Sequence, residues 1–121
     1  MNVNKLITTV AQQPLNRQVR VILGTYGINA LVYVNGNGDI VFNCDHPTCE
    51  PVVCGSLWAY LEKNITNESK KKVLIQRDYK LYQALAIKVG RFEYEPQCYP
   101  KVVKIFVDET ERFHYNVNDK N

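Results

Sequence analysis

The chain has 121 residues, of which 45% are hydrophobic and 22% are charged, and its net charge is +3 at pH 7. This composition fits one domain with its own core and excludes a disordered chain as the default. No apolar run approaches the roughly 20 residues that span a bilayer, and the first residues lack a small-residue cleavage pattern, so we expect a cytoplasmic protein. Frequent asparagine suggests an AT-rich genome, such as that of a phage or another virus, whose product would act in the host cytoplasm.

The first half of the chain predicts a helix, a strand and a hairpin. Residues 4–13 carry apolar side chains at helical spacing before Pro14, and residues 19–23 alternate as a strand does. Residues 28–44 form two apolar runs around an Asn-Gly-Asn-Gly sequence at 35–38, which is typical of a tight hairpin turn. An even-length loop places on one face Leu31, Tyr33, Ile40, Phe42 and Cys44, and on the other Ala30, Val32, Val34 and Val41. Because both faces are apolar, we expect the hairpin to be central in its sheet.

The second half begins with a short helix that Ser56 would cap and that ends near Asn64. Residues 72–89 allow two interpretations. One continuous helix would place Asp78 in its apolar stripe, where a lone carboxylate is costly to bury. We therefore favour a strand over 72–76 and a helix over 79–89, with Asp78 as N-cap and Gly90 as its end.

The C-terminal part predicts strands over 92–95, 102–107 and 113–117, with Val107 opposite Phe113. Residues 118–121 should be loose. Together the elements predict an α+β fold, with residues 1–121 as a single compact domain. Its sheet would be mainly antiparallel, with about five to seven strands, and two to three short helices would pack on it.

Three of the four cysteines and one of the two histidines lie between residues 44 and 54. A zinc site built from Cys44, Cys49 and Cys54 would need a fourth ligand, either His46 or Cys98. The spacing lacks the tight C-x2-C hook of common zinc modules, so buried core thiols are the alternative.

A cysteine-dependent enzyme is a second alternative. Cys54 would precede a helix N-terminus, where a thiolate is stabilised, and His46 or His114 would act as the base. No common catalytic motif is present, so an enzyme is the less favoured class.

Basic residues concentrate between residues 69 and 91. They are Lys70, Lys71, Lys72, Arg77, Lys80, Lys88 and Arg91. On one face they would contact phosphates, while Tyr79 and Tyr82 would stack on bases, as in a zinc-stabilised nucleic-acid-binding protein. Lysine runs are more often solvated loops, so this function is an alternative.

Our first expectation is a small, non-catalytic protein-binding module. The chain has eight tyrosines, and tyrosine is enriched at protein interfaces. We expect Tyr26, Tyr94 and Tyr99 to be exposed and to contact the partner. With the asparagine-rich composition, this suggests a phage- or virus-encoded accessory or inhibitory protein that acts on a host complex, and the basic segment would suit a complex that handles nucleic acid.

Overall fold

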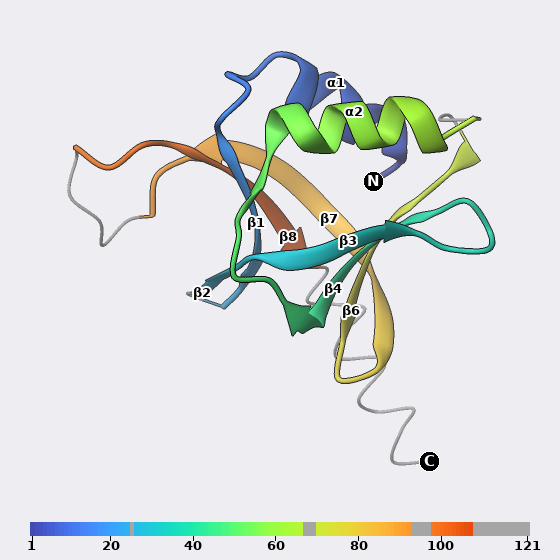
Figure 1. Ribbon diagram of the computed structural model, residues 1–121. Helices are drawn as coiled ribbons and strands as arrows, with labels where there is room; N and C mark the ends of the chain where they lie inside the picture. The colour runs from blue at the N-terminus through green and yellow to red at the C-terminus, as the bar shows by residue number, and fades with distance from the viewer. Residues whose placement is uncertain (25, 67–69, 93–97, 108–121) are drawn as a thin grey trace.

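The computed structural model describes residues 1–24, 26–66, 70–92 and 98–107 (Figure 1). The helices in these ranges are α1 (Val3–Ala11) and α2 (Cys54–Asn64). The strands are β1 (Gln18–Leu23), β2 (Tyr26–Ile28), β3 (Ala30–Val34), β4 (Ile40–Pro47), β5 (Val52–Val53), β6 (Val73–Arg77), β7 (Lys80–Gly90) and β8 (Val102–Val107). The strands form one curled sheet with the order β2-β1-β8-β7-β6-β4-β3, and the short β5 pairs with β1.

The sheet is mixed, which corrects the expectation of a mainly antiparallel sheet. β1 pairs with β8 in parallel, and β4 pairs with β6 in parallel. A parallel pair needs a long connection that returns the chain to the same end of the sheet. Between β4 and β6 the segment containing β5 and α2 supplies this connection. The α+β character is confirmed, with the strands and two helices sharing one main core.

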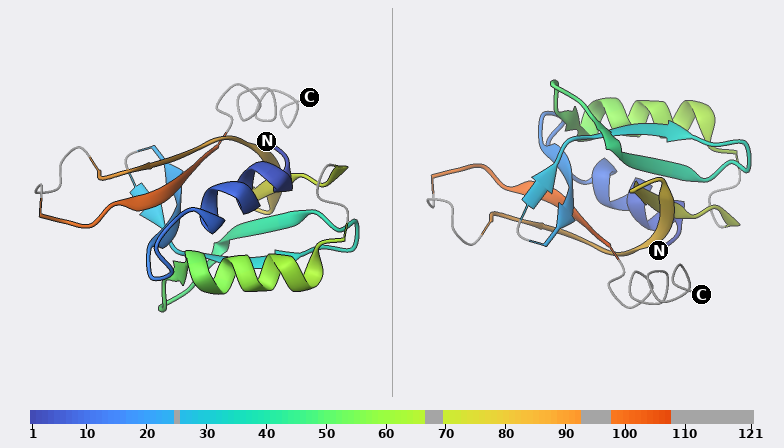
Figure 2. Two further views of the ribbon diagram at one scale, coloured as in Figure 1. Left: turned by 90° about the horizontal axis from the view of Figure 1, so that it is seen from above. Right: turned by 90° about the horizontal axis from the view of Figure 1, so that it is seen from below.

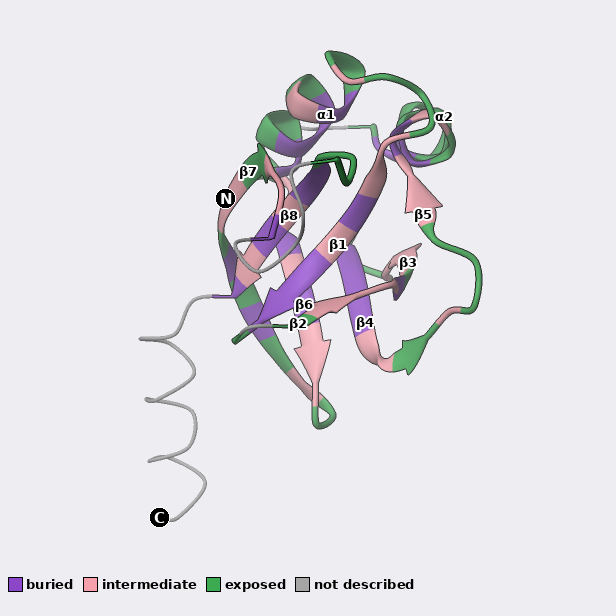
Figure 3. Ribbon diagram, turned by 90° about the vertical axis from the view of Figure 1, so that its left-hand side faces the viewer, coloured by how far each residue is buried: buried purple, intermediate pink, exposed green. Residues whose placement is uncertain are grey.

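The core lies between the inner face of the curled sheet and the two helices (Figure 2). Buried and partly buried positions alternate along much of β1 and β8 (Figure 3), and the exceptions, Ile22 and Val102, are buried in a second small cluster. The helices contribute Val3, Leu6, Ile7, Val10, Cys54, Leu57 and Leu61. The predicted N-terminal helix is therefore confirmed, and its side chains fill the concavity of the sheet.

The hairpin of β3 and β4 has a different register from the one expected. Val34 lies opposite Ile40 and Val32 opposite Phe42, across a five-residue loop at 35–39. Cross-strand partners share a face, so the expected sets of residues on the two faces were wrong. The side chain of Asn35 accepts hydrogen bonds from the backbone N–H groups of Asn37 and Asp39, both at 3.0 Å, and this arrangement stabilises the odd-length loop.

The hairpin is also not central in the sheet. β4 pairs with β6 on its other side, while β3 is the last strand in the sheet order. The outer apolar side chains of β3 are consequently not covered on both faces, and Leu31 is 43% exposed. An edge position therefore replaces the expected central one.

Residues 80–90 form strand β7, so the predicted helix over 79–89 was wrong. The strand expected over 72–76 is confirmed as β6. Asp78 and Tyr79 have φ angles of 54° and 64° and form a two-residue turn between β6 and β7. Asp78 is thus a turn residue instead of an N-cap, and the alternate residues Tyr82 and Ala84 face the core as in a strand.

The carboxylate of Asp45, at the end of β4, supports this turn. It accepts hydrogen bonds from the backbone N–H groups of Asp78 (2.8 Å) and Tyr79 (2.9 Å) and from the side chain of Gln76 (3.2 Å). Desolvation alone would raise the pKa of Asp45, but these hydrogen bonds outweigh it and hold the pKa below its ordinary value. The turn at Asp78 and Tyr79 is therefore stabilised by a residue distant in sequence, Asp45, and the local sequence does not indicate it.

Helix α2 ends at Asn64 as expected but begins before Ser56. Its N-cap is Val53, and the Ser56 hydroxyl donates to the Val53 carbonyl at 3.1 Å instead of accepting from the backbone. The predicted strand over 102–107 is confirmed as β8. The strand over 113–117, the pairing of Val107 with Phe113 and the tail at 118–121 lie outside the described residues, as does most of the strand over 92–95. Neither helix in the described ranges has the length and apolar character that crossing a bilayer requires.

Candidate functional site

The structure places the four cysteines in different environments. Cys54 is buried in the core, Cys44 is partly buried on β4, and Cys49 and Cys98 are exposed. His46 is exposed near the end of β4. Within the described ranges, no three side chains from histidine, cysteine, aspartate or glutamate gather into a group that would hold a metal ion. The geometry thus gives the zinc hypothesis no support.

The two less accessible thiols are held in the neutral form. Burial raises the pKa of Cys44 to about 12, and the neighbouring carboxylate of Asp45 adds to the shift while Arg77 opposes it. Burial also raises the pKa of Cys54, against the effect of Arg17. A neutral thiol is a poor nucleophile, so neither site activates a cysteine for catalysis. His114, the other base considered, lies outside the described residues.

The basic segment is distributed along the hairpin of β6 and β7 instead of forming one patch. Lys71 donates to the carbonyl of Asn37 at 2.8 Å, beside the β3–β4 loop. Arg77 lies at the opposite end of β6 and is 3.8 Å from the carboxylate of Asp78. The 11 residues of β7 span about 35 Å, which separates Lys80 from Lys88. Lys70 and Lys72 adjoin Lys71, and Arg91 directly follows β7.

The tyrosines proposed to stack or to bind protein have mixed positions. Tyr82 is buried in the core, whereas Tyr79 is 86% exposed at the turn. Tyr26 is 72% exposed on β2 and Tyr99 is 49% exposed. Tyr94 lies outside the described residues. Tyr26 and Tyr99 therefore have the expected exposure.

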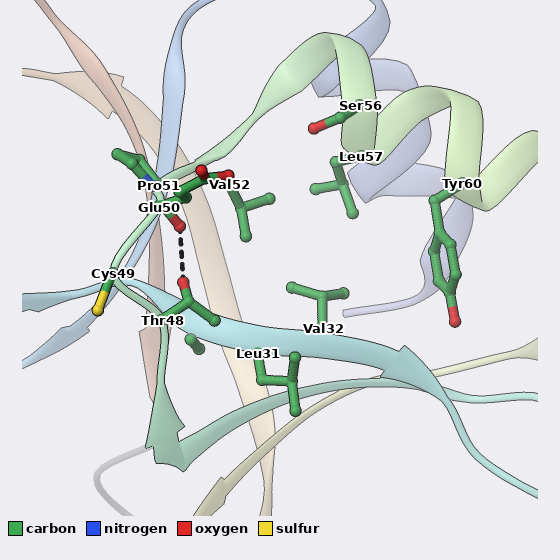
Figure 4. A pocket seen from close by; sticks show the side chains of 11 residues that line it. Leu31, Val32, Thr48, Cys49, Glu50, Pro51, Val52, Ser56, Leu57 and Tyr60 are labelled. Atoms are coloured by element: carbon green, nitrogen blue, oxygen red, sulfur yellow. Dashed lines mark hydrogen bonds between the residues drawn. The ribbon is translucent and has the colours of Figure 1, made fainter.

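A groove of about 520 Å³ lies between β3, α2 and the segment at 48–53 (Figure 4). Its walls are mainly apolar. They comprise Ala30, Leu31, Val32, Thr48, Cys49, Glu50, Pro51, Val52, Ser56, Leu57 and Tyr60. The Thr48 hydroxyl donates to the Glu50 carbonyl at 2.7 Å, and the Thr48 N–H donates to the Asn29 carbonyl at 2.8 Å. These bonds hold the segment at 48–53 against the start of β3 and so form one wall of the groove.

The open edge of β3 faces this groove. The Val34 N–H points towards α2 and donates to the Tyr60 hydroxyl at 3.0 Å, while the Asn35 N–H bonds back to Asp39 across the hairpin. Hydrogen-bonding directions alternate along a strand, so the N–H and C=O of Val32 point to the same open edge. Neither group of Val32 has a partner among the described residues. A strand edge and an apolar groove therefore coincide.

The sequence did not indicate this groove. Its walls come from a strand, a helix and a loop that meet only because β3 lies at the sheet edge. The apolar side chain of Leu31 is the one signal in the sequence, and alternation alone predicts burial for it.

Comparisons with protein families, with characterised proteins and with solved structures found no match to this chain. The geometry of the molecule is therefore the evidence on its function.

Proposed function

We propose that this chain is a non-catalytic protein-binding module that binds an extended segment of a partner protein along β3. The observation that carries the proposal is the unpaired N–H and C=O of Val32 beside an apolar groove. A peptide that adds a strand to an open sheet edge gains its affinity from main-chain hydrogen bonds and its specificity from side-chain pockets.

The walls of the groove define the chemistry of the bound segment. Leu31, Val52 and Leu57 supply apolar contacts, and a bound strand would direct every second side chain towards one wall. Among the described residues that line the groove, Glu50 alone is charged, which favours a basic residue in the bound segment. Tyr60 already bonds the Val34 N–H, so the bound strand is short and ends there. The expected ligand is an extended, mainly apolar peptide with one lysine or arginine.

The phage or viral origin and the host complex remain predictions, since they rest on composition alone. A zinc site and cysteine catalysis are weaker proposals, because the candidate ligands do not gather and two of the thiols are held neutral.

The test is a selection from a displayed library of random 12-residue peptides against the immobilised full chain. We expect enriched peptides with apolar residues at alternate positions. Their binding should protect the Val32 N–H from hydrogen exchange and shift its amide resonance in NMR spectra. Absence of enriched peptides, or peptides that leave the amide of Val32 unchanged, would contradict the proposal.

Two matched variants separate the main-chain contact from the side-chain contact. V32P removes the N–H on the open edge without removing a bond to β4, whereas V32A shortens the side chain and keeps that N–H. One hydrogen bond contributes about 1 kcal/mol, so V32P should weaken peptide binding at least about fivefold, while V32A should stay within about threefold of the wild type. Equal losses in the two variants would point to side-chain packing in place of strand addition.

A further inference from the structure

Three cations form one row across the outer face of β1, β8 and β7. Arg20 lies opposite Lys104 in the parallel pair of β1 and β8. Lys104 in turn lies opposite Lys88 in the antiparallel pair of β8 and β7. Neighbouring strands are about 4.8 Å apart, so the row is about 10 Å wide. Of these residues only Lys88 belongs to the basic segment that the sequence indicated.

No acidic side chain in the described part of the chain forms an ion pair with this row. Arg20 donates to the side chain of Gln18, Lys104 donates to the Arg91 carbonyl at 3.1 Å, and the Lys88 ammonium lies 5.6 Å from the ring centre of Phe106. The only ion pair among the described residues joins Arg77 to Asp78, elsewhere on the sheet. Like charges directly opposite each other on a sheet are destabilising, so the row carries a cost that an anionic ligand would remove.

Aromatic rings and shallow clefts flank the row on both sides. In the next cross-strand row, Phe106 lies between Ile22 and Ala86, and with Lys88 these residues line a cleft of about 210 Å³. On the other side a cleft of about 330 Å³ is lined by Arg17, Arg20, Tyr99, Lys101 and neighbouring residues. Two further cations therefore extend the positive surface towards an exposed tyrosine.

Neither helix covers this face. The small apolar cluster there consists of Ile22, Phe92 and Val102 with Phe106 packed against it, and it contains no residue of α1 or α2. Both helices pack on the opposite, inner face. Among the described residues, the helices therefore cover only the inner side of the sheet, and the outer side carries this small buried cluster beside the three cations.

We propose that the outer face of β1, β8 and β7 binds single-stranded nucleic acid. The row of Arg20, Lys104 and Lys88 neutralises phosphates, and bases stack on Phe106 and Tyr99. Sequence-tolerant binders of single strands combine a positive surface that follows the backbone with aromatic rings on which bases stack. An acidic peptide would satisfy the cations but would leave the rings without a stacking partner. This surface is separate from the groove beside β3, so the inference does not depend on the proposed peptide binding.

Fluorescence anisotropy of the full chain with labelled 15-nucleotide oligo-dT and oligo-U tests the proposal. Three phosphate contacts give a slope of about −2 for the logarithm of affinity against the logarithm of salt concentration. The variant R20Q/K88Q/K104Q should abolish most of this slope and weaken binding at least about tenfold at low salt. The matched control K70Q/K71Q/K72Q removes the same charge elsewhere and should change affinity less than about threefold. The DNA and RNA probes together show which sugar is preferred.

F106L tests base stacking separately from charge. It keeps an apolar side chain in the cluster but removes the ring, and it should weaken binding at least about fivefold with an unchanged salt slope. Far-UV circular dichroism should show that each variant is folded. If the triple variant is unfolded, the single variants R20Q and K88Q replace it, and each should reduce the slope by about 0.7.

Three outcomes would overturn the proposal. The first is no binding of either oligonucleotide at 50 mM salt. The second is an equal loss of affinity in the two triple variants, which would indicate a non-specific effect of net charge. The third is binding of labelled poly-glutamate as tight as that of the oligonucleotides, which would assign the face to an acidic protein.

Discussion

The groove beside β3 and the outer face of β1, β8 and β7 belong to one sheet but offer a ligand different groups. The groove lies at the sheet edge, so it presents unpaired main-chain groups beside an apolar wall with one carboxylate. The outer face lies among paired strands, where the main chain is already bonded, so it presents side chains alone: cations and rings. Position in the sheet thus determines which kind of recognition each surface supports.

The largest expected difference between the two surfaces is the dependence of their ligand affinity on ionic strength. Raising NaCl from 50 to 200 mM should weaken oligonucleotide binding about 16-fold, as a salt slope of about −2 requires. Binding of a selected peptide depends mainly on main-chain bonds and apolar contact, so it should change less than about twofold. Anisotropy titrations of both ligands against the same protein measure this. Equal salt dependence of the two ligands would remove the distinction.

Two aspartate substitutions, one on each surface, should each weaken the binding of one ligand and leave the binding of the other unchanged. Leu31 lines the groove and Leu85 lines the cleft beside Phe106, and both are exposed, Leu85 by 60%. L31D should weaken peptide binding about tenfold, because burying a leucine contributes about 1.5–3 kcal/mol, and should leave oligonucleotide binding unchanged.

L85D should do the reverse, since it places a carboxylate beside Lys88. Each variant thus serves as the control for the other. Loss of both ligands in either variant, with the fold retained, would show that the two surfaces are one site.

The two exposed cysteines allow each of the two surfaces to be labelled separately. Cys49 lines the groove, and Cys98 adjoins Tyr99 at the positive cleft. Because the pKa of Cys44 is about 12 and Cys54 is buried, maleimide at pH 7–8 should label only the two exposed thiols, which peptide mass spectrometry shows. In the variant C98S a bulky label attaches to Cys49 and should block peptide binding. In the variant C49S the same label attaches to Cys98 and should hinder oligonucleotide binding.

Modification of Cys44 at pH 8 would contradict the neutral thiol. In the folded protein the Cys44 thiol should ionise only near pH 12. Because the same thiol in the unfolded chain ionises from about pH 9, its contribution to stability should be lost as the pH rises from 9 towards 12.

The smallest expected effect concerns the cost of the cationic row. K88E and K88Q both remove the contact of the ammonium with Phe106, so their difference isolates the charge opposite Lys104. K88E should be more stable than K88Q by about 0.5 kcal/mol in urea unfolding at low salt, and 1 M NaCl should remove the difference. If K88Q is the more stable variant, the row carries no repulsion.

Local patterns in the sequence were sufficient to predict α1, β1, β6 and β8 and to predict that a hairpin exists at 28–44. In each case the spacing of apolar residues reports directly which face is buried. The same patterns gave a wrong prediction where a contact with a residue distant in sequence determines the local structure. Asp78 and Tyr79 form a turn because Asp45 bonds both N–H groups from another strand, and no pattern within residues 72–90 reveals that partner.

The two surfaces were not predictable for a related reason. The groove requires that β3 be an edge strand, and the cationic row requires the parallel pairing of β1 with β8, which brings Arg20 beside Lys104 from the far end of the chain. Counting charge along the chain emphasised Lys70 to Lys72 instead, because they are adjacent in sequence. Adjacency across strands depends on topology, which one sequence does not specify.

The irregularity in β7 has a mechanical consequence. Between Ala84 and Ala86 the register with β8 shifts, so the half of β7 that pairs with β6 and the half that pairs with β8 are set at an angle by one extra residue. Among the described strands, β7 alone joins the two halves of the curled sheet along the order β2-β1-β8-β7-β6-β4-β3. Slow opening of the protein should therefore begin at this joint, with faster amide exchange near Leu85 than in the paired residues on either side of it.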